Sequence, residues 1–474
     1  MPFHVSLVGR KNLSREIYRQ ISRAILDGRL RPGDRLTPSR ELAQSLSVSR
    51  MTVSVAYERL SAEGFVTSTQ GAGTYVASSA LQFARKRKSN SPGTLEPRAV
   101  WSLIQPPTLF GRAEHYDFRT GIPDASLFPH RAWYRAIARS LQSRELVRAE
   151  YGQPAGVHEL RVAIARHIGF SRGVEASAED VVVTAGTQQA IDLVARVLLA
   201  PGDAIAVEEP GYPPPRALFN VMGLRVVGVP VDRDGIDIAT IPRGVRAVYV
   251  TPSHQYPLSV AMTLPRRQGL LAWAERNQAA IIEDDYDSEF RFGGRPFEPL
   301  QTIDTQGRVI YVGSFSKTML PSLRIGFIVA PAALRDALRT AKFVSDWHTS
   351  SLVQVALARF MEEGAFARHV RRMTREYRER REIIVDTIRR EFGEELELIP
   401  SDAGLHVTAL ARKLKAEQLV RVQARAAKRG VAFHLLSLFS VPEKARSGIL
   451  LGYGTIPTFR IRDGLQRLRE CFDE

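Results

Sequence analysis

The sequence has almost no cysteine and no long apolar run. Its 474 residues include one cysteine, Cys471, so no disulfide forms within the chain and a reducing compartment is expected. No apolar stretch approaches the roughly 18 residues that a membrane span needs, and the opening residues MPFHVSLVGR lack the apolar core of a secretory signal. These absences exclude a disulfide-stapled scaffold and an integral membrane protein. We expect a soluble, cytoplasmic chain without a membrane partner.

The composition also excludes disordered and collagen-like classes. Hydrophobic residues make up 44% of the chain, charged residues 24% and aromatic residues 8%, which is ordinary for a globular protein. The length favours two or three domains over one.

Positive charge is in excess and is concentrated near the N-terminus. The formal net charge is +16; residues 1–88 hold 15 basic and 6 acidic side chains, and the other 386 residues hold 51 and 44. A basic module on a nearly neutral body is typical of a protein that binds a polyanion, because released counterions drive the association. A merely solubilising, arginine-rich surface would give the same charge, so charge alone leaves both interpretations open.

Three regions follow one another along the chain. Residues 1–78 have the pattern of a compact module that ends in a glycine-bounded hairpin, and residues 79–113, which contain RKRKSNSPGT, have the composition of a basic linker. Over residues 114–474, apolar runs such as VVVTAG, RAVYVTP and RVIYVGSFSK alternate with helical stretches. Alternating strands and helices with buried β-branched runs predict an α/β fold on a parallel or mixed sheet.

Three helices and a hairpin are predicted for the N-terminal module. The first helix has an apolar face of residues four apart, Ile17, Ile21 and Ile25. A short second helix, Ser39 to Ser45, is expected after an N-cap at Thr37, and the third helix after an N-cap at Ser49. The third helix presents one buried stripe, Val53, Ala56, Tyr57 and Leu60. Two short strands in FVTSTQGAGTYVA complete the pattern of a winged helix-turn-helix.

Such a module presents the start of its third helix to base edges in the major groove. Arg50 and Thr52 lie there beside the cap Ser49, and Arg40 lies at the start of the second helix, where it can meet a phosphate or a base. The tip of the wing carries two glycines, Gly71 and Gly73, which let the backbone approach a duplex closely. The alternatives are that the arginines are merely solvated, or that the module docks on a protein.

The module resembles the GntR-type winged-helix family over about 65 residues. The segments that carry the resemblance are LSREIYRQISRAILDGRLRPGDRLTPSRELAQSLSVSRMTVSVAYERLSAEGFV and QGAGTYV. The resemblance implies contacts to a double-stranded DNA operator by four residues, Arg40, Arg50, Thr52 and Gly71.

The large region carries the residue types that a phosphorylated aldehyde cofactor needs. Such a cofactor requires a lysine for a Schiff base, a carboxylate for its ring nitrogen, a stacking aromatic ring, and a phosphate cup with hydroxyls, free amides and an arginine. The segment GSFSKTMLPSLRIGF supplies Ser314, Ser316, Lys317 and Arg324. IIEDDYDSEF places Asp284 and Tyr286 at the end of a strand, and Tyr212 follows another strand. The turn of VVVTAGTQQAIDL directs three backbone amides at an anion, those of Gly186, Thr187 and Gln188.

In this order the segments resemble the fold-type I aminotransferases over roughly residues 114–474. The resemblance implies that Lys317 forms the internal aldimine with pyridoxal 5'-phosphate, that Asp284 pairs with the pyridine nitrogen, and that Tyr286 bonds the phenolic oxygen. Tyr212 would stack on the ring. The phosphate would be held by Ser314, Ser316, Arg324 and the turn 186–188. Tyr151, in EYGQPAG, matches a tyrosine that reaches into the partner subunit's phosphate site, which implies a homodimer.

The whole chain resembles the MocR-type regulators, in which a GntR-type head precedes an aminotransferase-like body. EEPGYP, TPSHQYPL, IIEDDYDSEF and GSFSK carry this resemblance. Two positions depart from active aminotransferases. Tyr256 stands where those enzymes have the asparagine of Asn-Pro-Thr-Gly, and Leu450 stands where they have the arginine that binds the substrate carboxylate, although Arg216 or another arginine could substitute for it.

We therefore predict a transcription regulator that binds DNA and senses pyridoxal phosphate, or an amine or amino acid, through the aldimine at Lys317. The alternative is an active aminotransferase with an accessory DNA-binding module; residual transaminase activity is the most that the regulator interpretation allows. No metal site is predicted.

Overall fold

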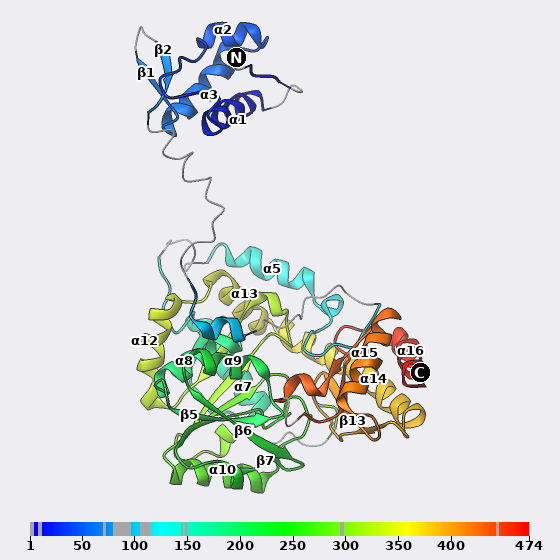
Figure 1. Ribbon diagram of the computed structural model, residues 1–474. Helices are drawn as coiled ribbons and strands as arrows, with labels where there is room; N and C mark the ends of the chain where they lie inside the picture. Colours follow the sequence, from blue (N-terminus) through cyan, green and yellow to red (C-terminus); the bar gives the residue numbers. More distant parts are fainter. Residues whose placement is uncertain are drawn as a thin grey trace. The chain divides into compact units, whose positions relative to one another are not determined.

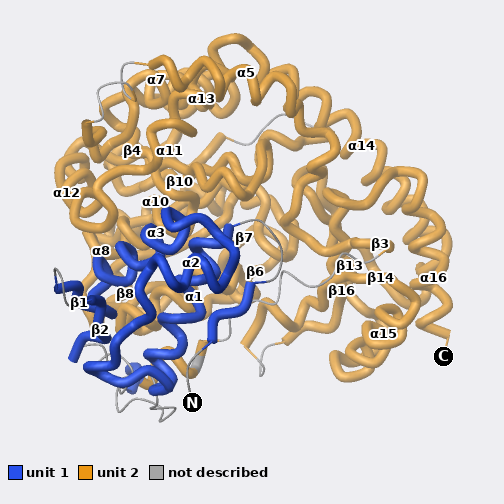
Figure 2. Tube along the Cα trace, turned by 90° about the horizontal axis from the view of Figure 1, so that it is seen from above, with its two compact units in different colours: residues 1–98 blue, residues 99–474 orange. Residues whose placement is uncertain are grey.

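The computed structural model describes residues 4–7, 12–69, 73–78, 96–104, 115–143, 146, 150–293, 298–441 and 445–473. The chain divides into two compact units, residues 1–98 and 99–474, which are coloured separately in Figure 2. Most of the predicted linker, and Gly71 of the predicted wing, lie outside the described residues; within the linker, Ala99–Leu103 forms the 3-10 helix η1. No helix in the described ranges is long and apolar enough to cross a membrane.

The described residues of the first unit form three helices and a hairpin. The helices are α1 (Leu13–Leu26), α2 (Ser39–Ser45) and α3 (Arg50–Ala62), and the antiparallel strands are β1 (Val66–Thr69) and β2 (Gly73–Val76). The predicted stripes of α1 and α3 pack against each other in one core, which includes Ile17, Ile21, Ile25, Val53, Ala56, Tyr57 and Leu60. Burial of these periodic side chains explains why so short a sequence folds as a unit.

One helix cap in this unit differs from the prediction. The N-cap of α2 is Pro38 rather than Thr37, and no side chain caps the helix. The Thr37 carbonyl instead accepts a hydrogen bond of 2.7 Å from the Tyr57 hydroxyl of α3. The start of α2 is thus positioned by a tertiary contact with α3, which a local capping rule does not consider.

The second unit is built on an eight-stranded sheet in the order β4-β11-β10-β9-β8-β5-β6-β7. Figure 1 labels β5, β6 and β7 of this sheet. Its strands are β4 (Val181–Thr184), β5 (Ala204–Glu209), β6 (Arg225–Asp232), β7 (Gly235–Ile236), β8 (Val245–Val250), β9 (Ala280–Asp285), β10 (Val309–Ser314) and β11 (Gly326–Val329). Neighbours from β10 through β9, β8 and β5 to β6 are parallel, whereas β11 runs antiparallel to both β4 and β10. The predicted mixed α/β sheet is confirmed.

Successive residues of the strands face opposite helical layers. In β4, Val181 and Val183 pack with one apolar cluster, and Val182 packs with another. The first cluster includes residues of α5 (His130–Ser140), α7 (His158–Arg172) and α13 (Ser351–Glu362); the second includes α8 (Thr187–Leu198), α9 (Pro213–Val221) and α12 (Arg335–Asp346). A third, around β5 and β8, packs on α10 (Leu264–Arg276). Burial on both faces explains the nearly continuous apolar runs of these strands.

The C-terminal part of this unit forms a smaller antiparallel sheet, β12-β13-β16-β15. Its strands are β12 (Leu396–Leu398), β13 (His406–Ala411), β15 (His434–Leu435) and β16 (Gly448–Gly452), and β14 (Val431–Ala432) pairs separately with β3 (Tyr116–Asp117). The helices α14 (Ala365–Glu391), α15 (Ala416–Lys428) and α16 (Ile461–Asp473) pack around them, with short α11 (Leu300–Ile303) beside the large sheet. Segments early and late in the chain are therefore neighbours here.

Candidate functional site

Lys317 lies in the turn that follows β10, at the carboxyl edge of the parallel strands. Its Nζ donates a hydrogen bond of 2.6 Å to the carbonyl of Gly121. Burial lowers the pKa of Lys317 below its ordinary value, and the carboxylates of Asp287 and Asp284 offset only part of this effect. A lowered pKa favours the neutral amine, the form that attacks an aldehyde.

Asp284 lies next to this turn, near the end of β9, and is 2% exposed. Its Oδ2 accepts a hydrogen bond of 2.7 Å from the Tyr249 hydroxyl, whereas its Oδ1 is buried with no hydrogen-bond partner. Burial, more than any other cause, raises the pKa of Asp284 to about 7. A buried acceptor without a donor is costly. The free Oδ1 fits the protonated ring nitrogen of a pyridine cofactor, which supplies the missing N–H.

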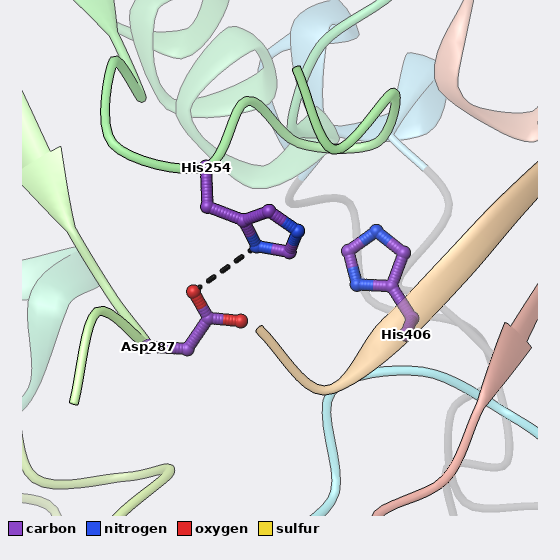
Figure 3. Close-up of side chains that lie close together, drawn as sticks. All are labelled: His254, Asp287 and His406. Carbon is purple, nitrogen blue, oxygen red and sulfur yellow. Dashed lines mark hydrogen bonds and ion pairs between the residues drawn. The ribbon is translucent and has the colours of Figure 1, made fainter. Parts of the chain in front are cut away.

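Tyr286 is fixed by a histidine that the sequence analysis did not single out. The Tyr286 hydroxyl donates a hydrogen bond of 2.9 Å to the carbonyl of His254 and lies 3.0 Å from its Nδ1. Asp287 Oδ1 lies 3.2 Å from the same Nδ1 (Figure 3). The ring of His254 is thus held by one carboxylate, and it positions the tyrosine in turn.

His406 completes a buried group with His254 and Asp287, in which one ligand-type atom of each residue lies within 4.8 Å of the others (Figure 3). Three residues of this kind resemble a metal site. The Nε2 of His406, however, already lies 3.1 Å from the Ser259 hydroxyl and 3.2 Å from the carbonyl of Pro257, and the His254 Nδ1 is engaged as described. We interpret His254 and Asp287 as hydrogen-bonded support for Tyr286; the His406 ring lies 5.0 Å from that of His254, whose buried Nε2 has no hydrogen-bond partner.

The turn before α8 has the features of a phosphate cup. Gly186 is the N-cap with a φ of 85°, and no side chain caps the helix, so its first amides stay available to an anion. A Cβ at Gly186 would lie 2.5 Å from Nη2 of Arg324, so only glycine permits this approach. The same Nη2 donates a hydrogen bond of 2.9 Å to the carbonyl of Ala185. Thr187 is the first residue of α8, and the side-chain Nε2 of Gln188 donates a hydrogen bond of 3.2 Å to the carbonyl of Pro214.

Ser314 and Ser316 lie at the same edge of the sheet. Their hydroxyls are 3.0 Å apart, and the Ser316 amide donates to Ser314 Oγ at 3.0 Å. Gly326 of β11 pairs with Ser314 on one side and with Thr184, just before the cup, on the other. The register therefore brings the two predicted phosphate-binding segments to one edge.

Two predicted tyrosines have different surroundings. Tyr212 is the N-cap of α9, and its ring lies 5.5 Å from that of Tyr256, close to perpendicular. Tyr256 in turn lies 5.9 Å from the ring of Tyr286, so Tyr212 borders the site. Tyr151 is 76% exposed and stacks on Trp347 at 4.4 Å, outside the hydrogen-bonded contacts of Lys317 and Asp284.

The first unit exposes the predicted DNA-contacting end of α3. Ser49 caps the helix, accepting a hydrogen bond of 3.1 Å from the Thr52 amide, and its hydroxyl lies 2.8 Å from that of Thr52. Arg40 and Arg50 are exposed. Gly73, the first residue of β2 at the turn end of the wing, has a φ of 122°, and a Cβ there would lie 2.9 Å from Nε of Arg35.

Comparisons with known proteins agree with this division of the chain. Residues 13–76 match the family of bacterial regulatory proteins, gntR family, and residues 117–449 match aminotransferase class I and II. The chain is 39% identical over 468 residues to the probable rhizopine catabolism regulatory protein MocR of Rhizobium meliloti, covering 97% of this chain and 94% of that protein. It is 34% identical to the pyridoxine biosynthesis regulator PdxR of Corynebacterium glutamicum, covering 93% and 91%. The chain belongs to the MocR-type transcription regulators.

Solved structures agree on the fold of the second unit. The kynurenine aminotransferase of Pyrococcus horikoshii matches with a TM-score of 0.70 at 25% identity, over 83% of this chain and 98% of that one. The α-aminoadipate aminotransferase LysN of Thermus thermophilus, solved with N-(5'-phosphopyridoxyl)-L-leucine, matches with a TM-score of 0.68 at 30% identity, over 75% and 92%. The predicted aminotransferase-like, fold-type I architecture is confirmed, as is the GntR-type head.

The two departures from active aminotransferases are packed in this regulator. Leu450 of β16 is buried in an apolar cluster with Val231, Leu258 and Leu436. Tyr256 bonds the hydroxyl of Thr120 at 2.9 Å. Arg216, considered above as a substitute for the missing arginine, forms an ion pair with Glu209.

Proposed function

We propose that this regulator binds operator DNA through the exposed end of α3 and pyridoxal 5'-phosphate through Lys317, and that it acts as a homodimer. The free, buried Oδ1 of Asp284 beside Lys317 is the observation that supports the cofactor most directly. An effector, either an amine or amino acid or the cofactor itself, would shift the equilibrium between two states by its differential affinity for them.

The residues of the site divide the work of holding the cofactor. Lys317 would hold its aldehyde carbon, Asp284 its ring nitrogen and Tyr286 its phenolic oxygen, while Tyr212 would stack on its ring. Its phosphate would be bound by Gly186, Thr187, Gln188, Ser314, Ser316 and Arg324. When bound, the cofactor supplies an electrophilic carbon that accepts amines. In the proposed dimer, the exposed Tyr151 would reach the partner subunit's phosphate.

In the head, Arg50 and Thr52 would read bases while Arg40, Ser49, Gly71 and Gly73 would contact the duplex nearby. The exposure of α3 at Met51, which is 70% exposed, and at Val55, which is 45% exposed, supports the same face. A groove-facing helix keeps such side chains free of the core.

A gel-shift titration of the operator, combined with the visible absorption of the cofactor, tests DNA binding and cofactor binding separately. Arg50→Ala should weaken operator binding by about tenfold or more at fixed salt, with the visible absorption of the cofactor unchanged. Arg59→Ala is the matched control, because Arg59 lies near the other end of α3 and pairs with Glu63 at 2.9 Å. Equal binding by the wild type and Arg50→Ala would contradict the assignment.

Lys317→Ala should abolish the visible absorption and the response to effector and should retain operator binding. Lys413→Ala, at an exposed lysine, is the control. The competing function is an active aminotransferase, which the retained Lys317, Asp284 and Tyr286 favour. Many rapid turnovers with amino acids and keto acids would support that function and contradict a regulator without catalysis.

A further inference from the structure

Three residues far apart in the sequence form a hydrogen-bonded chain beside Lys317. Thr120 precedes Gly121, whose carbonyl accepts the Lys317 Nζ. The Thr120 hydroxyl lies 2.9 Å from the Tyr256 hydroxyl and 3.0 Å from Nδ1 of His434. Thr120 is 4% exposed. Tyr256 stands where aminotransferases have an asparagine that bonds the cofactor's phenolic oxygen, so the chain would lie beside that oxygen, near the carbon that Lys317 would hold.

The direction of these hydrogen bonds is fixed by one backbone amide. The Thr120 N–H donates to the His434 Nδ1 at 3.3 Å, so this nitrogen is an acceptor and the ring proton lies on Nε2. The Thr120 hydroxyl must then also donate to Nδ1, and the Tyr256 hydroxyl must donate to Thr120. The oxygen of Tyr256 is left with its lone pairs. The chain therefore ends in a neutral acceptor.

Leu450 lies on the same face of the small sheet. It pairs directly with His434 of β15 and with Thr408 of β13 in antiparallel register, so the three side chains point to one side. Burial lowers the pKa of His434, which keeps its ring neutral near pH 7. The neighbouring Arg119 pairs with Asp117 at 2.7 Å. A carboxylate placed beside this chain would meet the acceptor oxygen of Tyr256, which is unfavourable, and Leu450, packed in its apolar cluster, offers it no positive charge.

We propose that the effector is a primary amine that carries hydrogen-bond donors such as hydroxyls and has no carboxylate. Its amine would reach the carbon held at Lys317, and a donor group would bond the Tyr256 oxygen. This inference rests on the proposed function and narrows its effector from amines and amino acids to one of these classes.

Matched amines test this class on the full-length protein loaded with pyridoxal phosphate. Serinol and L-serine differ only in that a hydroxymethyl group replaces a carboxylate, as do 4-amino-1-butanol and 4-aminobutyrate. We expect half-maximal changes in visible absorption and in operator binding at concentrations about tenfold or more lower for each alcohol. Equal or tighter binding of the amino acids would overturn the proposal, as would a response to pyridoxal phosphate alone with none to these amines.

Two variants connect the preference to the named residues. Tyr256→Phe should reduce the preference for the alcohols by about three- to tenfold, because it removes the acceptor. Leu450→Arg should strengthen binding of the amino acids, and Leu450→Met, which adds no charge, should not. If Leu450→Arg does not fold, an unchanged preference in Tyr256→Phe would still overturn the proposal. Loss of cofactor uptake or of operator binding by the wild type would instead defeat the proposed function itself.

Discussion

The two ends of the candidate site are built from different chemistry. The proposed phosphate end has helix amides, two hydroxyls and Arg324 against a glycine that leaves room for it. The opposite end has buried Leu450 and a neutral chain of Thr120, Tyr256 and His434. The first is suited to an anion, and the second to a neutral group.

The two ends therefore suit different tasks: one end suits the binding of the cofactor, and the other suits the recognition of a second ligand. The residues proposed to hold the cofactor are those that resemble aminotransferases, whereas Leu450 stands where those enzymes are expected to have the arginine for the substrate carboxylate. Loss of a bidentate arginine costs orientation that catalysis needs. A sensor, in contrast, needs only an effector that binds one of two protein conformations more tightly than the other. Such a division of the site fits a regulator that retains the cofactor and binds a different amine.

The largest effect on the cofactor end is expected from Asp284→Asn. The amide cannot stabilise a protonated ring nitrogen, so we expect about 100-fold weaker binding of pyridoxal phosphate, measured by titration of the visible absorption. Asp336→Asn, at a side chain that is 99% exposed, is the control and should bind normally. Unchanged affinity in Asp284→Asn would remove the basis for assigning the ring nitrogen to this residue.

The same variant should change the pH dependence of stability. Because the pKa of Asp284 is raised to about 7, the folded, cofactor-free chain binds its proton more tightly than the unfolded chain. Its contribution to the free energy of unfolding therefore falls as pH rises from about 4 to about 7. Asparagine does not ionise, so Asp284→Asn does not lose this stability as pH rises. Without cofactor its Tm should therefore exceed that of the wild type by roughly 2 °C at pH 8, and the difference in Tm should shrink toward pH 4.

The phosphate end is tested next by Gly186→Ala. The added Cβ would meet the Arg324 guanidinium, so cofactor affinity should fall about tenfold. Gly202→Ala is a matched control: Gly202 also has a positive φ, of 94°, but nothing lies within 4 Å of the added Cβ. Both variants should lose about 1 kcal/mol of stability from backbone strain. Equal cofactor affinity in the two would show that the cup is not at this turn.

Local sequence signals predicted the parts of the fold that depend on neighbouring residues. The stripes of α1 and α3 follow from periodicity, and the structure confirms them; it also confirms the bounds of α2, although not the predicted cap at Thr37. The roles of the predicted site residues stay predictions.

Other features required the tertiary structure. Thr120, Tyr256 and His434 lie on three segments more than a hundred residues apart, so no local pattern connects them. His254 was present in the quoted segment TPSHQYPL, but nothing in that segment shows that its ring contacts Asp287 and Tyr286. Which buried polar groups hydrogen-bond to one another depends on how the strands and helices pack, and a local sequence pattern does not show this.

The smallest effect on the cofactor, and the sharpest separation of the two ends, is expected from Thr120→Val. Valine keeps the shape and removes the hydroxyl, which leaves the Tyr256 hydroxyl without its acceptor and the His434 Nδ1 with the backbone amide alone. Affinity for pyridoxal phosphate should stay within about twofold, because no proposed cofactor contact involves this hydroxyl. The affinity for serinol should fall about threefold, since Tyr256 is then free to rotate its proton toward the effector. A cofactor titration and an amine titration on the same variant measure both quantities. If the cofactor affinity fell as much as the amine affinity, the two ends would act as one unit, and the separation argued from their chemistry would be wrong.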